Sequence, residues 1–409
     1  MAGTEAPSSA PAAATTTGLN HRLRRMVGRD PHERGRAATP LELLFDLAFV
    51  AAFGIAGNQM AHALAEDHVA VAIGGFAFGA FAITWAWINF SWFASAFDTD
   101  DWLYRVMTIV QMAGVLVLAA GVHAAMVDFD FLTVTWGYVI MRLAMVGQWL
   151  RAAASDPESR PTALRFAFGI GVVQVLWLAR IYLLDEQWQF WTFFVLVAAE
   201  LAVPVWAESH RRTSWHPHHI AERFGLFTLL LLGESLLASA NAMIDALSAG
   251  EHIPELLGLA ACGLVVTAGI WWLYFAREQH GRLTSLRSGF TFGYLHYVIF
   301  ASAGAVSAGV EVEIDAITGH TEISHEVAGL ALTLPIALFV LSAWAILLKA
   351  SLSRWVSASV VIGAILIAAS GLLPIGEYVV SALLLIAIVV LLEADAARRG
   401  LPAEPARTI

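Results

Sequence analysis

Apolar runs of about 20 residues with few charges recur along this chain, and their length constrains the fold most. An α-helix rises 1.5 Å per residue, so about 20 apolar residues are needed to cross roughly 30 Å of hydrocarbon. Backbone groups in lipid must be satisfied within the segment, and runs this long suit helices and not barrel strands. We therefore predict an all-α integral membrane bundle of about twelve transmembrane helices. The runs lie near 41–64, 69–96, 103–126, 131–153, 163–184, 188–207, 221–245, 254–276, 289–311, 326–348, 355–374 and 376–393.

The composition fits a lipid solvent and argues against several other classes of protein. Only 14% of the 409 residues are charged, 58% are hydrophobic and the mean hydropathy is +0.69, whereas a soluble domain carries about 25% charged residues. No basic surface suggests a nucleic-acid partner. The chain holds no Walker A loop, Gly-x-Ser-x-Gly, His-Glu-x-x-His or Cys-x-x-Cys motif. We therefore expect neither an enzyme nor a bound cofactor.

Lysine and arginine outside the apolar runs are confined to alternate loops and to the two ends of the chain. The ionisable residues of the other predicted loops are only acids and histidines. Because basic loops stay in the cytoplasm, we predict that both termini are cytoplasmic. Residues 1–37 are expected to form a disordered basic tail and residues 396–409 a second cytoplasmic tail. The basic loop positions are Arg105, Arg151, Arg160, Arg165, Arg211, Arg212, Arg277, Arg282, Arg287, Lys349 and Arg354.

The helical region is predicted to be duplicated, with one six-helix half over 38–207 and another over 208–395. Short similar segments begin or end corresponding helices of the two halves. The number of residues between matching segments increases slowly along the chain. Two halves of even helix count share one orientation, so the axis that relates them would follow the membrane normal. The matching positions are Glu42 with Glu222, Trp87 with Trp272 and Gly121 with Gly309, which are 180, 185 and 188 residues apart.

Two segments resemble signatures of the bacterial low temperature requirement protein A family. They are Leu41-Glu-Leu-Leu-Phe-Asp-Leu-Ala-Phe-Val50 and His218-His-Ile-Ala-Glu-Arg-Phe-Gly-Leu-Phe-Thr-Leu-Leu-Leu-Leu-Gly-Glu-Ser235. The resemblance covers residues 38–395 and implies a multi-pass protein of the bacterial inner (plasma) membrane, linked by name to growth in the cold. It implies no particular molecular activity. A fainter similarity is to potassium channels built from two six-helix halves, whose Phe-Ser-Asp motif lacks its serine here, at Phe45-Asp46.

Charged residues inside the predicted helices are candidates for function, because each costs about 2.5–3.5 kcal/mol at mid-bilayer. Three deep acids, Asp46, Glu200 and Glu234, accompany two deep arginines, Arg142 and Arg180. Pairing would neutralise two acids and leave one carboxylate able to exchange a proton, as a proton-coupled transporter requires. Glu234 is the best single candidate for that carboxylate. Ion pairs that merely hold the helices together explain the same residues almost as well.

Helical spacing groups further polar residues with these acids. Arg223, Glu234 and Asn241 are 11 and 7 residues apart, which places them on one face of the seventh predicted helix. Glu42 and Asp46 are four residues apart and share a face of the first helix. Glu42 also follows Pro40 closely, so it is suited to interact favourably with the helix N-terminus.

Four residues again separate Asn58 from His62, on the side of the first helix opposite Asp46. Polarity on two sides is typical of a helix enclosed by others and not of one that faces lipid. His216, His218 and His219 precede the seventh helix and are weak candidates for a metal site. Their spacing matches no standard metal motif, and a solvated loop is the simpler interpretation.

Together these features favour a secondary transporter, coupled to protons or another cation, in contact with the bilayer and a small solute or ion. Asp46 and Glu234 would handle the coupling ion, while Arg142 or Arg180 would be a partner charge or an anion contact. A cation channel is one alternative, suggested by the acid near the entrance of the first helix. Another is a non-transporting sensor or scaffold whose buried charges only stabilise the bundle. The sequence identifies neither the substrate nor the oligomeric state.

Overall fold

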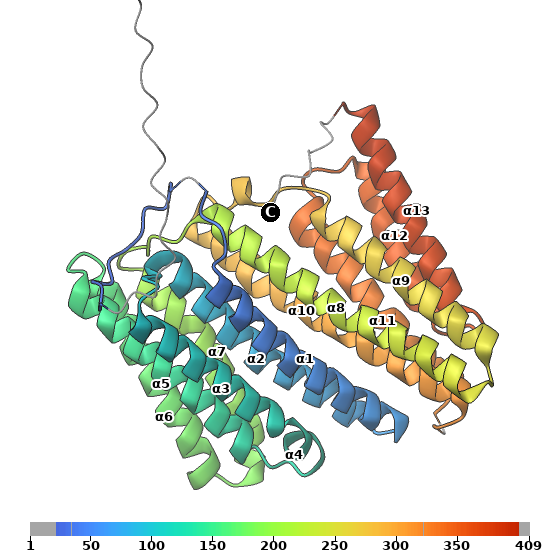
Figure 1. Ribbon diagram of the computed structural model, residues 1–409, viewed down its shortest axis with the longest axis horizontal. Helices are drawn as coiled ribbons and strands as arrows, with labels where there is room; N and C mark the ends of the chain where they lie inside the picture. Colours follow the sequence, from blue (N-terminus) through green and yellow to red (C-terminus); the bar gives the residue numbers. More distant parts are fainter. Residues whose placement is uncertain (1–21, 34, 322, 401–409) are drawn as a thin grey trace, which may run out of the picture.

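The structure, a computed structural model, describes residues 22–33, 35–321 and 323–400, and its regular elements over these ranges are helices (Figure 1). The first group comprises α1 Pro40–Ala65, α2 Val69–Phe97, α3 Trp102–Ala120, α4 Val122–Val127, α5 Leu132–Ser155, α6 Arg160–Leu183 and α7 Glu186–Glu208. The second comprises α8 Pro217–Ala249, α9 Ile253–Phe275, η1 His280–Arg282, α10 Leu286–Thr318, α11 His325–Ala343, η2 Trp344–Leu348, α12 Arg354–Ser370 and α13 Glu377–Arg398. The short η1 is a 3-10 helix, and η2 is a π-helical turn that continues α11.

Every predicted apolar run contains a helix, and the all-α class predicted from the sequence is confirmed. Within the described ranges, ten helices are long and apolar enough to cross a bilayer. They do not include α5, which carries Arg142 and Arg151, or α12, which is apolar but has only 17 residues. The third predicted run is divided at Gly121, where α3 ends and α4 begins. A chain with this many apolar helices is a multi-pass membrane protein.

The first turn of α1 is defined by a capping box. The Thr39 hydroxyl accepts a hydrogen bond from the backbone N–H of Glu42 at 3.3 Å, and the Glu42 carboxylate accepts one from the backbone N–H of Thr39 at 2.8 Å. Pro40 follows as the first helical residue, where its missing N–H leaves no donor unsatisfied. These local contacts fix the residue at which α1 begins and hold the Glu42 side chain at the end of the bundle.

Three helices, α1, α8 and α10, contact one another in the middle of the bundle (Figure 1). The helices α2 to α7 lie on one side of this centre, and α9 and α11 to α13 lie on the other. Both α1 and α2 pack against both α8 and α10. These contacts form the junction between the part of the chain before residue 209 and the part after it.

Glycines allow two pairs of neighbouring helices to approach closely. A Cβ atom added to Gly121 would lie 2.7 Å from the backbone nitrogen of Val134, at the start of α5. One added to Gly309 of α10 would lie 2.6 Å from the carbonyl oxygen of Ala331 in α11. Small residues serve this purpose in membrane bundles, where close backbone contact and van der Waals packing hold helices together.

Residues 22–33, expected to belong to a disordered tail, pack instead against the end of the bundle. Met26 is fully buried, and the backbone N–H of Gly28 donates to the Asp156 carboxylate at 3.0 Å. The backbone N–H of Arg24 donates to Asp101 at 2.9 Å, and Arg151 forms an ion pair with the same aspartate. The segment is ordered because the loop after α2 and the end of α5 provide acceptors for its backbone. Residues 1–21 and 401–409 lie outside the described residues.

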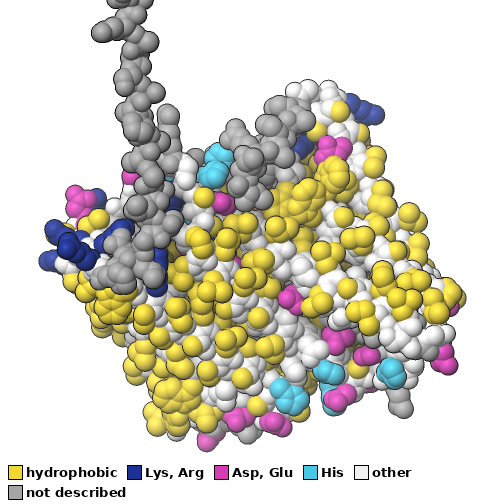
Figure 2. All heavy atoms as spheres, viewed as in Figure 1, with side chains coloured by type: hydrophobic (Ala, Val, Ile, Leu, Met, Phe, Trp, Pro, Cys, Tyr) yellow, Lys and Arg dark blue, Asp and Glu magenta, His cyan; other side chains and the backbone are white. Residues whose placement is uncertain are grey.

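Charged side chains are distributed unequally between the two ends of the bundle. In Figure 2, Lys and Arg lie at the end where residues 22–33 pack and where α13 finishes. Asp, Glu and His side chains lie at both ends, but the opposite end shows no Lys or Arg in this view, and a hydrophobic surface covers the face between the two ends. This is the distribution that the alternating basic loops predicted.

Candidate functional site

Ion pairs buried between α1 and α8 form the core of the candidate site. The Arg223 guanidinium donates from Nη2 to Oδ1 of Asp46 at 2.5 Å and from Nε to Oδ2 at 3.3 Å. Its Nη1 lies 2.9 Å from Oε1 of Glu42. All three side chains have zero solvent exposure. Two acids one helical turn apart on α1 therefore share one arginine of α8.

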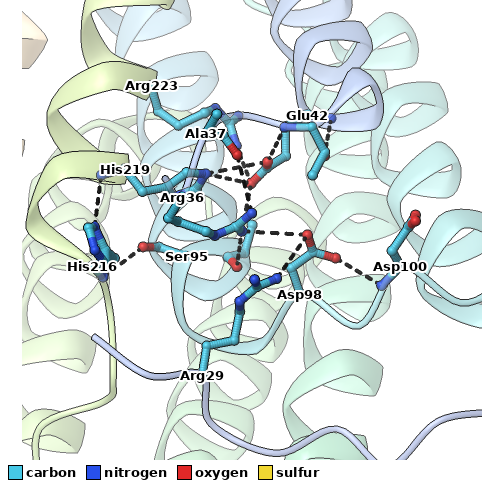
Figure 3. Close-up of polar contacts among 12 residues, drawn as sticks. Arg29, Arg36, Ala37, Glu42, Ser95, Asp98, Asp100, His216, His219 and Arg223 are labelled. Atoms are coloured by element: carbon cyan, nitrogen blue, oxygen red, sulfur yellow. Dashed lines mark hydrogen bonds and ion pairs between the residues drawn. The ribbon is translucent and has the colours of Figure 1, made fainter. Parts of the chain in front are cut away.

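Three further buried groups extend this cluster toward the end of the bundle (Figure 3). His219, one turn before Arg223, places Nε2 at 3.3 Å from Glu42. Arg36 lies 3.8 Å from Glu42 and 3.5 Å from Asp98, the residue that ends α2. The cluster thus joins α1, α2, α8 and the segment that precedes α1.

Trp87 of α2 completes the surroundings of Asp46. Its indole N–H donates to Oδ1 of Asp46 at 2.7 Å, and its ring lies 5.6 Å from the Arg223 guanidinium. A buried ion pair needs such additional hydrogen bonds, because removing two charges from water costs several kcal/mol per ion. Asp46 was predicted to handle a coupling ion. The structure places it in a buried ion pair that connects two helices, and its role in ion coupling stays a prediction.

A second closed ion pair lies between α5 and α7. Arg142 donates to Glu200 at 2.9 Å, and both side chains are 2% exposed. The Trp85 indole donates to the same carboxylate at 3.0 Å, and the Tyr138 hydroxyl contacts Arg142. The structure therefore places Arg142 and Glu200 in a buried pair with no net charge, joined through Nη2 of Arg142 and Oε2 of Glu200.

Of the three deep acids, Glu234 is the one left without an ion pair among the described residues. It lies in the middle of α8 and is half-buried. Its carboxylate covers Gly54 of α1, since a Cβ atom there would come within 2.8 Å of Oε2. Arg180 also has no acidic partner within the described ranges. Counting charges predicted an unpaired acid, but it did not predict an unpaired arginine.

The polar face of α8 becomes more exposed along the helix. Arg223 is buried, Glu234 is half-buried and Asn241 is exposed. Across from this face, the Asn58 side chain donates to Glu311 of α10 at 2.8 Å. His62, one turn beyond Asn58, is exposed, and so are apolar residues of α1. The expectation that α1 is enclosed by other helices is therefore wrong, because its outward face has no covering helix.

The three clustered histidines do not converge on one point. The His219 ring faces Glu42, the His216 ring contacts the backbone carbonyl of Glu33 at 2.9 Å, and His218 is exposed. Over the described part of the chain, no group of three or more His, Cys, Asp or Glu side chains is placed to hold a metal ion. Two of the rings instead contact the start of the chain, His216 at Glu33 before α1 and His219 at Glu42 in the first turn of α1.

Two members of the cluster, Arg36 and Asp98, were not predicted from the sequence. Arg36 was counted with the basic tail and Asp98 was not singled out. One signal was available, because Arg36 stands only six residues before Glu42 and is the basic residue of the tail nearest to it. Asp98 carried no such signal, since its proximity arises from the packing of α2 against α1.

Asp98 is expected to make stability depend on pH. Burial, followed by the negative charge of Glu42, raises the pKa of this carboxyl to about 6, although Arg36 and Arg29 oppose the shift. The folded protein therefore holds the proton more tightly than the unfolded chain, whose pKa is 3.8. The resulting stabilisation, about 3 kcal/mol, is fully present below about pH 4 and is lost as the pH rises through 6.

Asp98→Asn should remove this dependence. We expect unfolding measurements in detergent to show that the wild-type protein loses stability relative to the variant as the pH rises from about 4 to 7. A difference that stays constant across this range would contradict the assignment.

Comparisons with known proteins cover nearly the whole helical region. The profile of a family described as bacterial low temperature requirement A protein matches residues 37–394. An uncharacterized protein of Rhizobium meliloti (strain 1021) is 26% identical over 295 residues, which cover 66% of this chain and 69% of that protein. No solved structure matches the chain. The four helices that carry the two sets of buried ion pairs, α1, α5, α7 and α8, lie inside the matched range.

Proposed function

Because the chain belongs to the bacterial low temperature requirement A family, whose profile spans its whole bundle, we propose that the whole bundle has one function. That function is secondary transport coupled to protons or another cation. The proposal includes α5 and α12 as membrane crossings, which gives twelve in two six-helix halves. It places both termini in the cytoplasm of a bacterial cell, since the Lys and Arg side chains gather at their end of the bundle.

Repeated helix contacts support the two halves. The pairs α1–α2, α3–α5, α5–α6 and α6–α7 have counterparts in α8–α9, α10–α11, α11–α12 and α12–α13, all of which are in contact. Gly121 and Gly309, which the sequence alignment of the halves matched, each allow close approach to the next long helix. Tandem halves of this kind are common in secondary transporters, where one half moves against the other around a site near mid-membrane.

The observation that carries the proposal is the position of Glu234. It lies at the junction of the halves, against Gly54 of α1, beyond the ion pairs that close the junction at the Lys/Arg end. Its face of α8 becomes exposed toward the opposite end, at Asn241. A carboxylate without an ionic partner at this depth can gain and lose a proton from that side. In the proposal, the cluster of Arg223, Asp46 and Glu42 is the contact that must open for access from the cytoplasm.

Glu234→Gln is expected to abolish coupled flux. Purified protein would be placed in liposomes that contain a pH-sensitive dye, and a gradient of Na⁺ or K⁺ would be imposed. The wild-type protein should convert the cation gradient into a pH change, and the variant should not, because the amide cannot exchange a proton. Glu255→Gln, an exposed acid in the first turn of α9, is the matched control and should retain the flux. Equal flux in all three proteins would remove Glu234 from the mechanism.

The closed ion pairs favour a second candidate, a membrane scaffold or sensor that transports nothing. Asp46 and Glu200 each form an ion pair with a buried arginine, as residues that only hold a bundle together would do. This candidate predicts no cation-driven pH change from the wild-type protein. A cation channel differs from both, because it would give single-channel conductance in planar bilayers without any coupled pH change.

A further inference from the structure

A cavity of about 480 Å³ lies inside the first group of helices, between α2, α4, α5, α6 and α7. It lies at the end of the bundle opposite the cluster formed by Arg36, Glu42 and Arg223. Along α2 the cavity extends from Ala70 to Ala82, which is about 18 Å of helix. Phe129 and Phe190, 68% and 52% exposed, line its outer part, whereas Tyr138 lies deeper and is buried. The volume is within the range of sites that bind small molecules, about 300–1,000 Å³.

The wall of this cavity is mostly apolar, but it contains a buried cation. Arg180 is only 4% exposed and is the one charged side chain among the described lining residues. Its Nε donates to the backbone carbonyl of Gln189 at 2.8 Å. Rings of Phe131, Trp177 and Phe193 lie 5.4–5.8 Å from the guanidinium. No acidic side chain of the described ranges forms an ion pair with it.

Polar atoms beside Arg180 also lack partners. Gln174 is 4% exposed and lines the cavity, and both its amide nitrogen and its amide oxygen are without hydrogen-bond partners over the described chain. The indole N–H of Trp177, which also lines the cavity, is unsatisfied as well. Native proteins satisfy most buried polar groups, so several unsatisfied groups in one wall indicate a missing partner. Two of the unsatisfied groups, the Gln174 amide N–H and the Trp177 indole N–H, are hydrogen-bond donors, as is the Arg180 guanidinium.

The other arginine near the cavity does not contribute a free charge. Arg142 contacts Tyr138 in the cavity wall, but its charge is neutralised by Glu200 at 2.9 Å. The cavity therefore presents one uncompensated positive charge inside a long apolar space. The complementary ligand has a single negatively charged head and an apolar body.

We propose that this cavity binds an anionic amphiphile, with a carboxylate or phosphate head on Arg180 and an acyl chain along α2. The head would accept hydrogen bonds from the guanidinium and from the Gln174 and Trp177 donors. The acyl chain would lie against Gly74 and Gly79, whose missing side chains leave room in the wall. The rim at Phe129 and Phe190 gives the head access from the surface of the bundle. The site is independent of proton coupling at Glu234.

Native mass spectrometry of the full chain in detergent tests the role of the charge. Oleate and dioleoyl phosphatidylglycerol are the anionic probes, and oleyl alcohol and dioleoyl phosphatidylcholine are probes without net charge. The wild-type protein should bind at least one anionic probe more tightly than its uncharged counterpart. Arg180→Gln should weaken that binding about tenfold or more, because a charge-assisted hydrogen bond is lost. Arg180→Lys should retain part of it, since lysine keeps the charge but not the planar donors.

A cavity-filling variant tests the role of the apolar space. A Cβ atom at Gly74 would meet no atom within 4 Å, so Gly74→Phe fits the backbone and fills the cavity. It should abolish binding of the anionic probe. Gly171→Phe is the matched control, because Gly171 on α6 also has open space around it but does not line the cavity. Thermal unfolding of each variant separates loss of binding from loss of fold.

Each outcome decides between the alternatives. Binding of oleate alone identifies a free fatty acid as the ligand, and binding of phosphatidylglycerol alone identifies a membrane lipid. Uncharged probes that bind as tightly as anionic ones would overturn the proposal, as would binding unaffected by both Arg180→Gln and Gly74→Phe. Glu234→Gln should bind the probes normally, so failure of the transport proposal leaves this result interpretable.

Discussion

Replacing Arg223 with glutamine is expected to lower the free energy of unfolding by about 3–5 kcal/mol, the usual cost of breaking a buried ion pair. The loss should be at the upper end of this range, because one arginine serves both Glu42 and Asp46 and all three side chains are inaccessible to solvent. Without it, two carboxylates four residues apart on one helix would repel each other in a low dielectric. Denaturant or thermal unfolding of the purified protein measures the effect.

Two further variants identify the cause. Glu42→Gln and Asp46→Asn, added to Arg223→Gln, neutralise the orphaned carboxylates and should recover a large part of the lost stability. Arg211→Gln removes an exposed pair with Glu158, 53% and 74% exposed, and should cost less than about 1 kcal/mol. An Arg223→Gln protein as stable as Arg211→Gln would show that the cluster does not hold α1 against α8.

Substituting leucine for Gly309 should destabilise the second group of helices by about 1–3 kcal/mol or more. The new side chain would begin 2.6 Å from the carbonyl oxygen of Ala331 and from the Cα atom of Leu332. Both atoms belong to the backbone of α11, which can yield only if the whole helix moves away from α10. The midpoint of thermal unfolding in detergent reports the loss.

Gly233→Leu is the control for this substitution. Gly233 is an exposed helical glycine of α8 with no atom within 4 Å of its added Cβ. Leucine there should leave stability unchanged or raise it by up to about 1 kcal/mol, because glycine is a poor helix former. If both leucine variants lost equal stability, close packing of α10 on α11 could not be the reason.

The helices were predictable because hydrocarbon thickness fixes how long an apolar run must be. Predicted and observed boundaries agree to within a few residues for most helices, as for α1, predicted at 41–64 and observed at Pro40–Ala65. Length alone did not reveal the break at Gly121. At that position Thr133 and Val134 of the next helix approach too closely for a side chain, which only glycine allows.

Partners within the site could not be predicted in the same way. Helical periodicity places Arg223 and Glu234 on one face of α8, but it does not say which helix lies against that face. Arg223 was therefore grouped with Glu234, although it pairs with Asp46, 177 residues away in the sequence. Asp46 forms its ion pair with Arg223 and Glu200 forms one with Arg142. Arg180 therefore has no acidic partner among the described residues. The cavity followed from tertiary packing alone.

The distance of 177 residues between Asp46 and Arg223 has a consequence for biosynthesis. At about 5–20 residues per second, the ribosome needs roughly 9–35 s to make the arginine after the aspartate. During this interval Glu42 and Asp46 have no Arg223 to pair with, and Arg36 is the nearest positive charge already made. The ion pairs that join α1 to α8 can thus form only after α8 has been made. Fragments cut between α7 and α8 should consequently be degraded when made singly and rescued when made together.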